Sequence, residues 1–194
     1  MDGSEDSGRC DSSTPVRPSA QGDVWVFAYG SLMWRPDFVP LENRPARLFG
    51  WRRALCILST IYRGTDAAPG LVLGLDRGGS CLGRALKVAA AQWSEVRARL
   101  DARELPTGVY LPRFLPARLH ECGTPIQAYA YVADRRHWQY WRGSPAEAVR
   151  LLRQGRGKAG TARDYLAQTV VQLSAMGIGA GDLHRLLERV DRGD

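Results

Sequence analysis

A Tyr-Gly-Ser-Leu turn directly after an apolar run is the first feature of this sequence that could hold a charged group. Residues 24–28 are apolar, two of them β-branched and two aromatic, and they predict a buried strand. Gly30 then permits close backbone approach, and Ser31 supplies a hydroxyl group. A strand that ends this way leaves backbone N–H groups for a carboxylate or an oxyanion. On Tyr29–Leu32 alone, a tight turn without a ligand is the simpler interpretation.

Glu104 is the second candidate for chemistry. An apolar stripe predicts a helix over residues 90–102, and Pro106 and Gly108 end it, so Glu104 is expected just past the last turn. The stripe consists of Trp93, Val96 and Leu100. A glutamate at a helix end is usually a solvated charge or an ion-pair partner, here of Arg103. Beside apolar walls, however, its pKa would rise and it could act as a general base.

The cysteines and histidines do not have the spacing of metal ligands. The four cysteines are far apart without a C-x-x-C pair, and the three histidines are scattered. We therefore expect no metal, no cofactor and no disulfide framework. Cys56 and Cys81 lie in apolar, strand-like runs and are interpreted as core thiols. The segment Gly155–Gly160 lacks the order of a phosphate-binding loop and is interpreted as a connector between helices.

These candidates must be positioned by a sheet of many short strands with Gly-rich turns. Residues 46–58 predict one long strand or a pair, and Asp76–Gly79 predicts a hairpin turn between two further strands. The remaining expected strands are 71–75, 81–88, an extended segment interrupted by prolines at 110–119, and the alternating run 126–132. So many strands favour a closed or strongly curved, mainly antiparallel sheet.

The last third of the chain predicts helices. Ser144–Glu147 is a capping box with proline at the first helical position, and Thr161–Asp164 resembles a second helix start. Asp182 is expected to cap a third helix. Together with the predicted sheet, these helices indicate an α+β fold: a small, mainly antiparallel mixed β-barrel with flanking and C-terminal helices.

Composition indicates one globular domain. Residues 1–22 are rich in Asp, Ser, Gly and Pro and are predicted to be a disordered tail, with a single domain over 23–194. The chain has a net charge of +7; the first 22 residues carry four acids and two arginines, so the remainder carries +9. A basic domain can bind nucleic acid, but its arginines are spread out and no aromatic-basic RNA motif is present. The charge also suits an anionic peptide substrate.

No apolar run approaches the ~18 residues of a transmembrane helix. The first residues lack a basic start followed by an apolar stretch, so we expect no secretory signal and a cytoplasmic enzyme. The sequence does not indicate an oligomeric state.

Several motifs together resemble the ChaC branch of the γ-glutamylcyclotransferases. Residues 27–36 (FAYGSLMWRP) are similar to the opening signature of that family, and the resemblance extends from about residue 24 to about residue 178. Further motifs in the family's order are Trp51–Arg53, Arg63–Thr65, Pro69–Leu75, Gly79–Gly83 and Arg103–Glu104. The resemblance implies a γ-glutamylcyclotransferase-like fold.

The resemblance also implies a lyase reaction that degrades glutathione. The α-amine of the γ-glutamyl group attacks its own side-chain carbonyl, which yields 5-oxoproline and cysteinylglycine without a metal, a cofactor or a covalent enzyme intermediate. Glu104 is implied as general base and then general acid, with Tyr29, Gly30, Ser31 and Leu32 as the substrate-binding set. Tyr110 is a weaker candidate for a substrate contact, since a tyrosine at the core edge is the simpler interpretation. Trp34 and Arg63 are weaker still.

One departure from the family leaves the substrate open. Asp66-Ala67-Ala68 precedes Pro69-Gly70, where the family commonly has Pro-Glu. This loop is expected at the mouth of the pocket, so one alternative is a cyclotransferase for other γ-glutamyl amino acids or amines. A second alternative is a non-catalytic domain of the same fold that binds a partner or RNA through its basic surface. The presence of both Tyr29–Leu32 and Glu104 argues against this second alternative.

Overall fold

The structure is a computed structural model that describes residues 22–178 and 181–192. The predicted tail, residues 1–22, lies outside the described residues except for Gly22. From the N-terminus the elements are β1 (Val24–Ala28), η1 (Ser31–Met33), β2 (Glu42–Ser59), β3 (Gly70–Val88), η2 (Ala90–Gln92), α1 (Trp93–Glu104), β4 (Tyr110–Leu119), β5 (Pro125–Ala133), α2 (Pro145–Gln154), β6 (Arg156–Gly157), β7 (Gly160–Thr161), α3 (Ala162–Ala175) and α4 (Asp182–Arg192). The symbol η marks a 3₁₀ helix.

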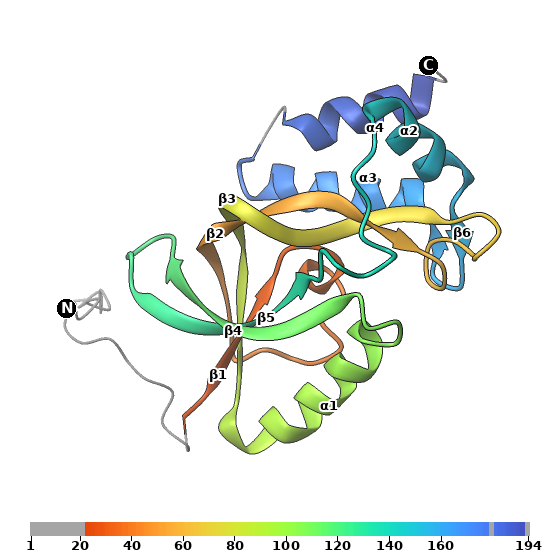
Figure 1. Ribbon diagram of the computed structural model, residues 1–194. Helices are drawn as coiled ribbons and strands as arrows, with labels where there is room; N and C mark the ends of the chain where they lie inside the picture. Colours follow the sequence, from red (N-terminus) through yellow and green to blue (C-terminus); the bar gives the residue numbers. More distant parts are fainter. Residues whose placement is uncertain (1–21, 179–180, 193–194) are drawn as a thin grey trace.

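Five strands close into a barrel in the order β1-β3-β2-β4-β5. Neighbouring strands run antiparallel, except that β5 pairs in parallel with β1 and at one position with β3. Helix α1 packs on one side of the barrel, and the C-terminal helices lie together on the other side, over β3 (Figure 1). The predicted α+β fold with a mainly antiparallel mixed barrel is therefore confirmed.

The predicted hairpin turn at Asp76–Gly79 is wrong. Residues 70–88 form one continuous strand, which pairs with β2 before and after the two glycines. Gly78 and Gly79 have φ values of 102° and 69°, and Gly50 opposite them has a φ of 79°. The register shifts there, between Phe49 and Trp51. Glycine's conformational freedom thus bends both strands at a β-bulge instead of reversing the chain, and the reversal occurs at residues 60–69.

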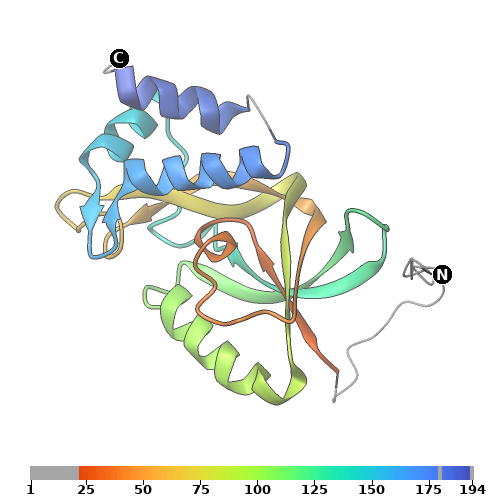
Figure 2. The same ribbon diagram turned by 180° about the vertical axis from the view of Figure 1, so that it is seen from behind.

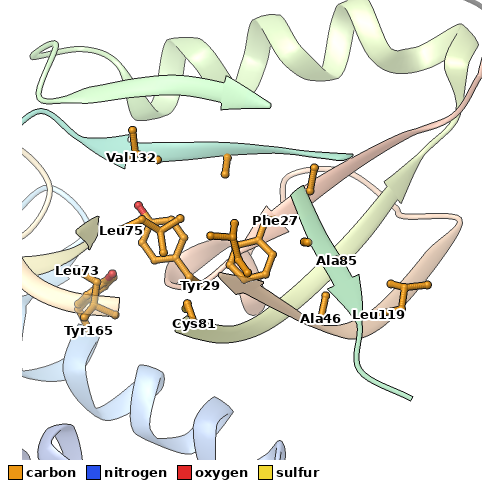
Figure 3. Close-up of a cluster of buried hydrophobic side chains, with 14 residues drawn as sticks. Phe27, Tyr29, Ala46, Leu73, Leu75, Cys81, Ala85, Leu119, Val132 and Tyr165 are labelled. Carbon is orange, nitrogen blue, oxygen red and sulfur yellow. The ribbon is translucent and has the colours of Figure 1, made fainter. Parts of the chain in front are cut away.

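The barrel interior is filled by apolar side chains from all five strands (Figure 3). Phe27 and Leu75 are fully buried, and small residues such as Ala46 and Ala85 let the strands close tightly around them. Cys56 and Cys81 are buried free thiols, as predicted.

Strand β5 has two apolar faces because a helix covers its outer side. Ala128, Ala130 and Val132 belong to the barrel core, as the alternation predicted, while Tyr129 and Tyr131 pack outward with helix α1. One carboxylate oxygen of Asp101 accepts hydrogen bonds from both phenols, at 2.8 Å and 2.7 Å. This contact fixes how α1 sits on the barrel, and with it the position of the helix's last residues.

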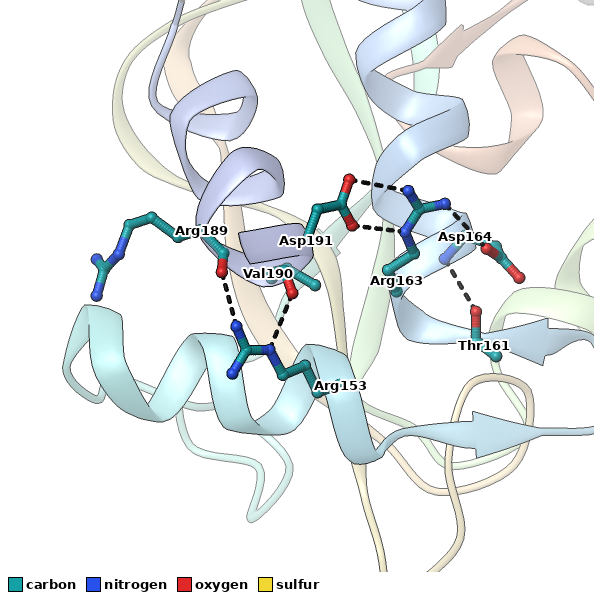
Figure 4. A network of polar contacts seen from close by, with 7 residues as sticks. All are labelled: Arg153, Thr161, Arg163, Asp164, Arg189, Val190 and Asp191. Carbon is teal, nitrogen blue, oxygen red and sulfur yellow. Dashed lines mark hydrogen bonds and ion pairs between the residues drawn. The ribbon is translucent and has the colours of Figure 1, made fainter. Parts of the chain in front are cut away.

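The three C-terminal helices form a layer over β3 (Figure 2). Ser144 makes the predicted capping box with Glu147, and the Thr161 hydroxyl accepts from the amide of Asp164 at 3.0 Å. Asp182 is the first residue of α4, one position inside the predicted cap. Arg153 and Arg163 join the helices: Arg153 donates to two backbone carbonyls of α4, and Arg163 forms a two-bond ion pair with Asp191 (Figure 4).

One local prediction needs correction. Glu104 is the last residue of α1 rather than the first residue of the following loop, since the helix continues through Arg103. The segment Gly155–Gly160 connects helices α2 and α3, as predicted, and β6 within it pairs antiparallel with β7, which ends at Thr161. None of the helices in the described part of the chain is both long and apolar enough to cross a membrane.

Candidate active site

A cavity of about 370 Å³ lies where the η1 turn, the loop end of the β2–β3 hairpin, the C-terminus of α1 and helix α3 meet. The cavity has the size of a small-molecule site. All six residues predicted for catalysis or substrate binding line it: Tyr29, Gly30, Ser31, Leu32, Glu104 and Tyr110.

The η1 turn presents unused backbone donors. Its first carbonyls accept from residues further along: Gly30 O accepts from the Met33 amide at 2.9 Å, and Ser31 O from the Arg35 amide at 2.8 Å. Within residues 22–178 and 181–192, the N–H groups of Gly30, Ser31 and Leu32 donate to no protein acceptor. Such orphan donors at the start of a helical turn suit a carboxylate or an oxyanion.

Gly30 leaves room for a neighbouring side chain. A Cβ atom at this position would lie 2.7 Å from the hydroxyl oxygen of Tyr165. Tyr165 comes from α3, more than a hundred residues further along the chain, and packs against Trp34 with a ring separation of 5.8 Å. The glycine thus allows the Tyr165 hydroxyl to approach the turn.

Arg103 connects the turn to Glu104. Its guanidinium donates to the Ser31 hydroxyl at 2.8 Å and to the Arg35 carbonyl at 2.6 Å, and it also pairs with Asp37. The Nε atom lies 3.1 Å from a carboxylate oxygen of Glu104. One arginine therefore sets the distance between the predicted binding turn and the predicted base.

The environment of Glu104 raises its pKa above the ordinary value for a glutamate. Burial is the main cause, because it penalises the charged form. Arg103 opposes the shift, and the negative charge of Asp37 adds to it. The side chain remains 19% exposed, facing the cavity that it lines. A carboxyl group with a raised pKa can accept a proton and return it near neutral pH.

Two tyrosines of the cavity donate to backbone carbonyls. The Tyr29 hydroxyl donates to the Tyr131 carbonyl at 2.9 Å, and the Tyr110 hydroxyl to the Leu73 carbonyl at 2.6 Å. Burial raises the pKa of both phenols well above the usual value, so both are neutral at physiological pH. Each hydroxyl oxygen can still accept a hydrogen bond from a ligand.

Comparison with known proteins agrees with this geometry. The family model described as "ChaC-like protein" matches residues 24–192. The chain belongs to the ChaC-like family. A crystal structure of a yeast γ-glutamyl cyclotransferase specific to glutathione, 20% identical, has the same fold, with a TM-score of 0.79 over 88% of this chain and 96% of that one.

Two curated relatives of this ChaC-like protein are named for the same activity. The Escherichia coli protein named glutathione-specific γ-glutamylcyclotransferase is 34% identical over 89% of this chain and 74% of its own length. The human protein named glutathione-specific γ-glutamylcyclotransferase 1 is also 34% identical, over 86% of this chain and 81% of its own.

The structure adds residues to this ChaC-like site that sequence patterns did not indicate. Tyr165 and Gln139 both line the cavity, but each stands in a segment with no motif of its own. Gln139 is 2% exposed; its Nε2 donates to the Leu58 carbonyl at 2.7 Å, while its Oε1 has no partner among the described residues. The sequence pattern offered no signal for either residue, because both are placed by contacts between distant segments.

The two weaker candidates, Arg63 and Trp34, differ in their position relative to the cavity. Arg63 lines the cavity, whereas Trp34 reaches it only through its contact with Tyr165. The Asp66–Ala68 segment, expected at the pocket mouth, is not among the residues that line the cavity, although Thr60–Arg63 of the same loop are. Among the described residues no three His, Cys, Asp or Glu side chains are grouped so as to hold a metal ion.

Proposed function

We propose that this ChaC-like protein cleaves glutathione into 5-oxoproline and cysteinylglycine, with Glu104 as general base and then general acid. The observation that carries the proposal is that one cavity is lined both by Glu104, whose pKa is raised, and by the Gly30–Leu32 turn with its unused N–H groups. The names and 34% identity of the Escherichia coli and human relatives support glutathione as the substrate.

The reaction needs no second reactant. The α-nitrogen of the γ-glutamyl group forms a bond to the side-chain carbonyl carbon, and the amide bond from that carbon to the cysteine nitrogen breaks. From the α-ammonium form, the α-nitrogen loses two protons to become the lactam N–H, and the departing nitrogen gains two to leave as an ammonium group. A single carboxyl group can carry these protons in two successive transfers. A metal or an enzyme nucleophile is not needed for this balance.

Glu104 suits this double role because its pKa lies closer to neutrality than that of an exposed glutamate. An α-ammonium group has no lone pair with which to attack, so the first step is its deprotonation. An ordinary glutamate is a weak base for this task, whereas a buried carboxylate gains by accepting the proton. Arg103, whose Nε atom lies 3.1 Å from a carboxylate oxygen of Glu104, orients this side chain and opposes the rise of its pKa.

The remaining groups of the site would orient the substrate. The N–H groups of Gly30, Ser31 and Leu32 would hold the α-carboxylate or the oxyanion that develops on the attacked carbonyl. Tyr110 and Tyr29 would accept hydrogen bonds from N–H groups of the ligand. Holding the γ-glutamyl chain bent toward its own carbonyl lowers the entropic part of the barrier to ring closure.

The decisive experiment is incubation of the purified protein with glutathione, without metal or nucleotide, and assay of both products. Equal amounts of 5-oxoproline and cysteinylglycine are expected. Glu104→Gln should keep the fold and lower kcat by about 100- to 10,000-fold. Glu95→Gln is the matched control, because Glu95 lies on the same helix, pairs with Arg99 and is exposed. Near wild-type turnover by Glu104→Gln would refute the assignment of the base.

The same assay separates the competing functions. Release of 5-oxoproline from other γ-glutamyl amino acids or amines, but not from glutathione, would keep the chemistry and change the substrate. No turnover of any γ-glutamyl compound, together with salt-dependent retention on heparin, would favour a non-catalytic binding domain with a basic surface.

A further inference from the structure

Arg63 has a well-defined position in the wall of the cavity. It lies in the loop that joins β2 to β3, and its backbone amide donates to the Ser59 hydroxyl at 3.0 Å. The β6–β7 connector closes over the preceding residues: the amide of Lys158 donates to the Ile61 carbonyl, and that of Ala159 to the Tyr62 carbonyl, both at 2.9 Å. The loop is thus held from two sides, and the position of Arg63 is defined by hydrogen bonds.

The guanidinium of Arg63 is held by an aromatic face and a carbonyl. It lies 5.6 Å from the centre of the Tyr165 ring, and its Nη1 donates to the Thr161 carbonyl at 3.3 Å. Within the described residues no carboxylate forms an ion pair with it. Arg103 differs, because Glu104 and Asp37 both pair with it.

This cation is therefore only partly compensated. Burial is the main cause that lowers the pKa of Arg63; the Tyr165 phenol and the Asp164 carboxylate oppose the shift, and the positive charges of Arg35 and Arg103 add to it. A half-buried guanidinium with free donors is costly unless a ligand neutralises it. Its planar donor pair matches a carboxylate.

We propose that Arg63 binds the C-terminal carboxylate of the leaving group, so that the site selects γ-glutamyl peptides over γ-glutamyl amines. This inference rests on the proposed function and deepens it. Glutathione has two carboxylates, and the unused N–H groups of the Gly30–Leu32 turn, beside Glu104, suit the one nearest the reacting carbonyl. Arg63 is separated from that turn by Tyr165, whose hydroxyl approaches Gly30 and whose ring carries the guanidinium. We therefore assign the second carboxylate, at the C-terminus of the leaving group, to Arg63.

The test compares two substrates that differ only in this carboxylate: glutathione and its C-terminal amide, γ-Glu-Cys-Gly-NH₂. The wild type should show kcat/KM about 10- to 100-fold lower for the amide, the range expected for hydrogen bonds to a charged group. Arg63→Gln should lose a similar factor on glutathione and show nearly equal kcat/KM for the two substrates. Arg63→Lys should retain part of the discrimination.

Two outcomes would overturn the proposal. If the ratio of kcat/KM for glutathione to that for the amide is the same in Arg63→Gln as in the wild type, another group binds this carboxylate. An equal loss on both substrates would mean that Arg63 serves the other carboxylate or only holds the loop. Arg156→Gln is the control. Arg156 lies in β6, within the connector that packs on the Arg63 loop, but it is exposed and does not line the cavity. Thermal melting verifies that each variant is folded.

Calorimetric binding of both compounds to Glu104→Gln and to the double variant Glu104→Gln, Arg63→Gln separates this inference from the proposed function. If the wild type turns over no γ-glutamyl compound, the proposed function fails. A preference of Glu104→Gln for glutathione over its amide, lost in the double variant, would still support Arg63 as the carboxylate site. Equal binding of the two compounds by Glu104→Gln would refute it.

Discussion

At the scale of single residues, the charges around Glu104 determine the pH at which the site works. Asp37 raises the pKa of Glu104 and also shares Arg103 with it. In Asp37→Asn the repulsion disappears and Arg103 is left to Glu104, so the pKa of Glu104 falls. Because the base acts in its deprotonated form, the acidic limb of the kcat/KM profile should move to lower pH. Asn also tolerates the positive φ of 62° at this position.

The measurement is the pH dependence of kcat/KM for glutathione in the wild type, in Asp37→Asn and in Glu95→Gln as the control. An acidic limb that stays in place in Asp37→Asn, or moves to higher pH, would contradict the electrostatic account of the base.

A second residue-scale prediction concerns the contact between Gly30 and Tyr165. In Gly30→Ala the added methyl group would meet the Tyr165 hydroxyl, so we expect kcat/KM to fall by about 10- to 100-fold through displacement of the turn. Tyr165→Phe removes the clashing atom, since the next nearest atom of that ring lies at 3.8 Å. The double variant should therefore show a favourable coupling of about 1 kcal/mol or more. Strict additivity of the two losses would contradict this steric explanation.

At the scale of elements, Asp76 joins the barrel to the segment after β5. Its buried carboxylate accepts from Arg52 of β2 and from Arg135, each at 2.6 Å, and from the Tyr140 hydroxyl at 3.1 Å. Burial alone would raise the pKa of Asp76, but the hydrogen bonds from Arg135 and Tyr140 outweigh it and lower the pKa. The same segment carries Gln139 into the cavity wall.

Asp76→Asn should lower the free energy of unfolding by about 2 kcal/mol at neutral pH, because hydrogen bonds to a charged group are lost. Since the folded-state pKa is depressed, this contribution is present above the unfolded pKa and is lost as the pH falls through the folded pKa. Urea unfolding across that range measures it. A stability difference from wild type that does not shrink at acidic pH would refute a role for the ionised carboxylate.

At the scale of the whole molecule, charge is distributed unevenly along the chain. Residues 1–22 carry a net −2 and the rest carries +9. The predicted domain boundary and the attraction of an anionic substrate can be tested together by deleting residues 1–21. We expect the melting temperature to be retained and kcat/KM for glutathione to rise by up to about twofold at low salt, with the gain lost at high salt. A large drop in melting temperature would contradict a domain that begins at residue 23.

The sequence alone determined the parts of this protein that depend on neighbouring residues. The strand at Val24–Ala28 and the helix caps at Ser144 and Thr161 rest on local patterns and were predicted correctly. The family motifs also predicted the set Tyr29–Leu32, Glu104 and Tyr110, all of which line one cavity. Asp76–Gly79 was misinterpreted because glycine permits a bulge as readily as a turn, and only the pairing partner decides between them.

The tertiary structure decided what surrounds those residues. Arg103 reaches Ser31 across 72 positions of the sequence, and Arg63 reaches the Thr161 carbonyl across 98. Tyr165 and Gln139 enter the cavity without any motif. Propensity and periodicity act over a few residues, whereas burial, charge pairing and the raised pKa of Glu104 arise when distant segments exclude water together. The sequence could therefore indicate the reacting groups, and only the packed barrel and helices could place them in one site.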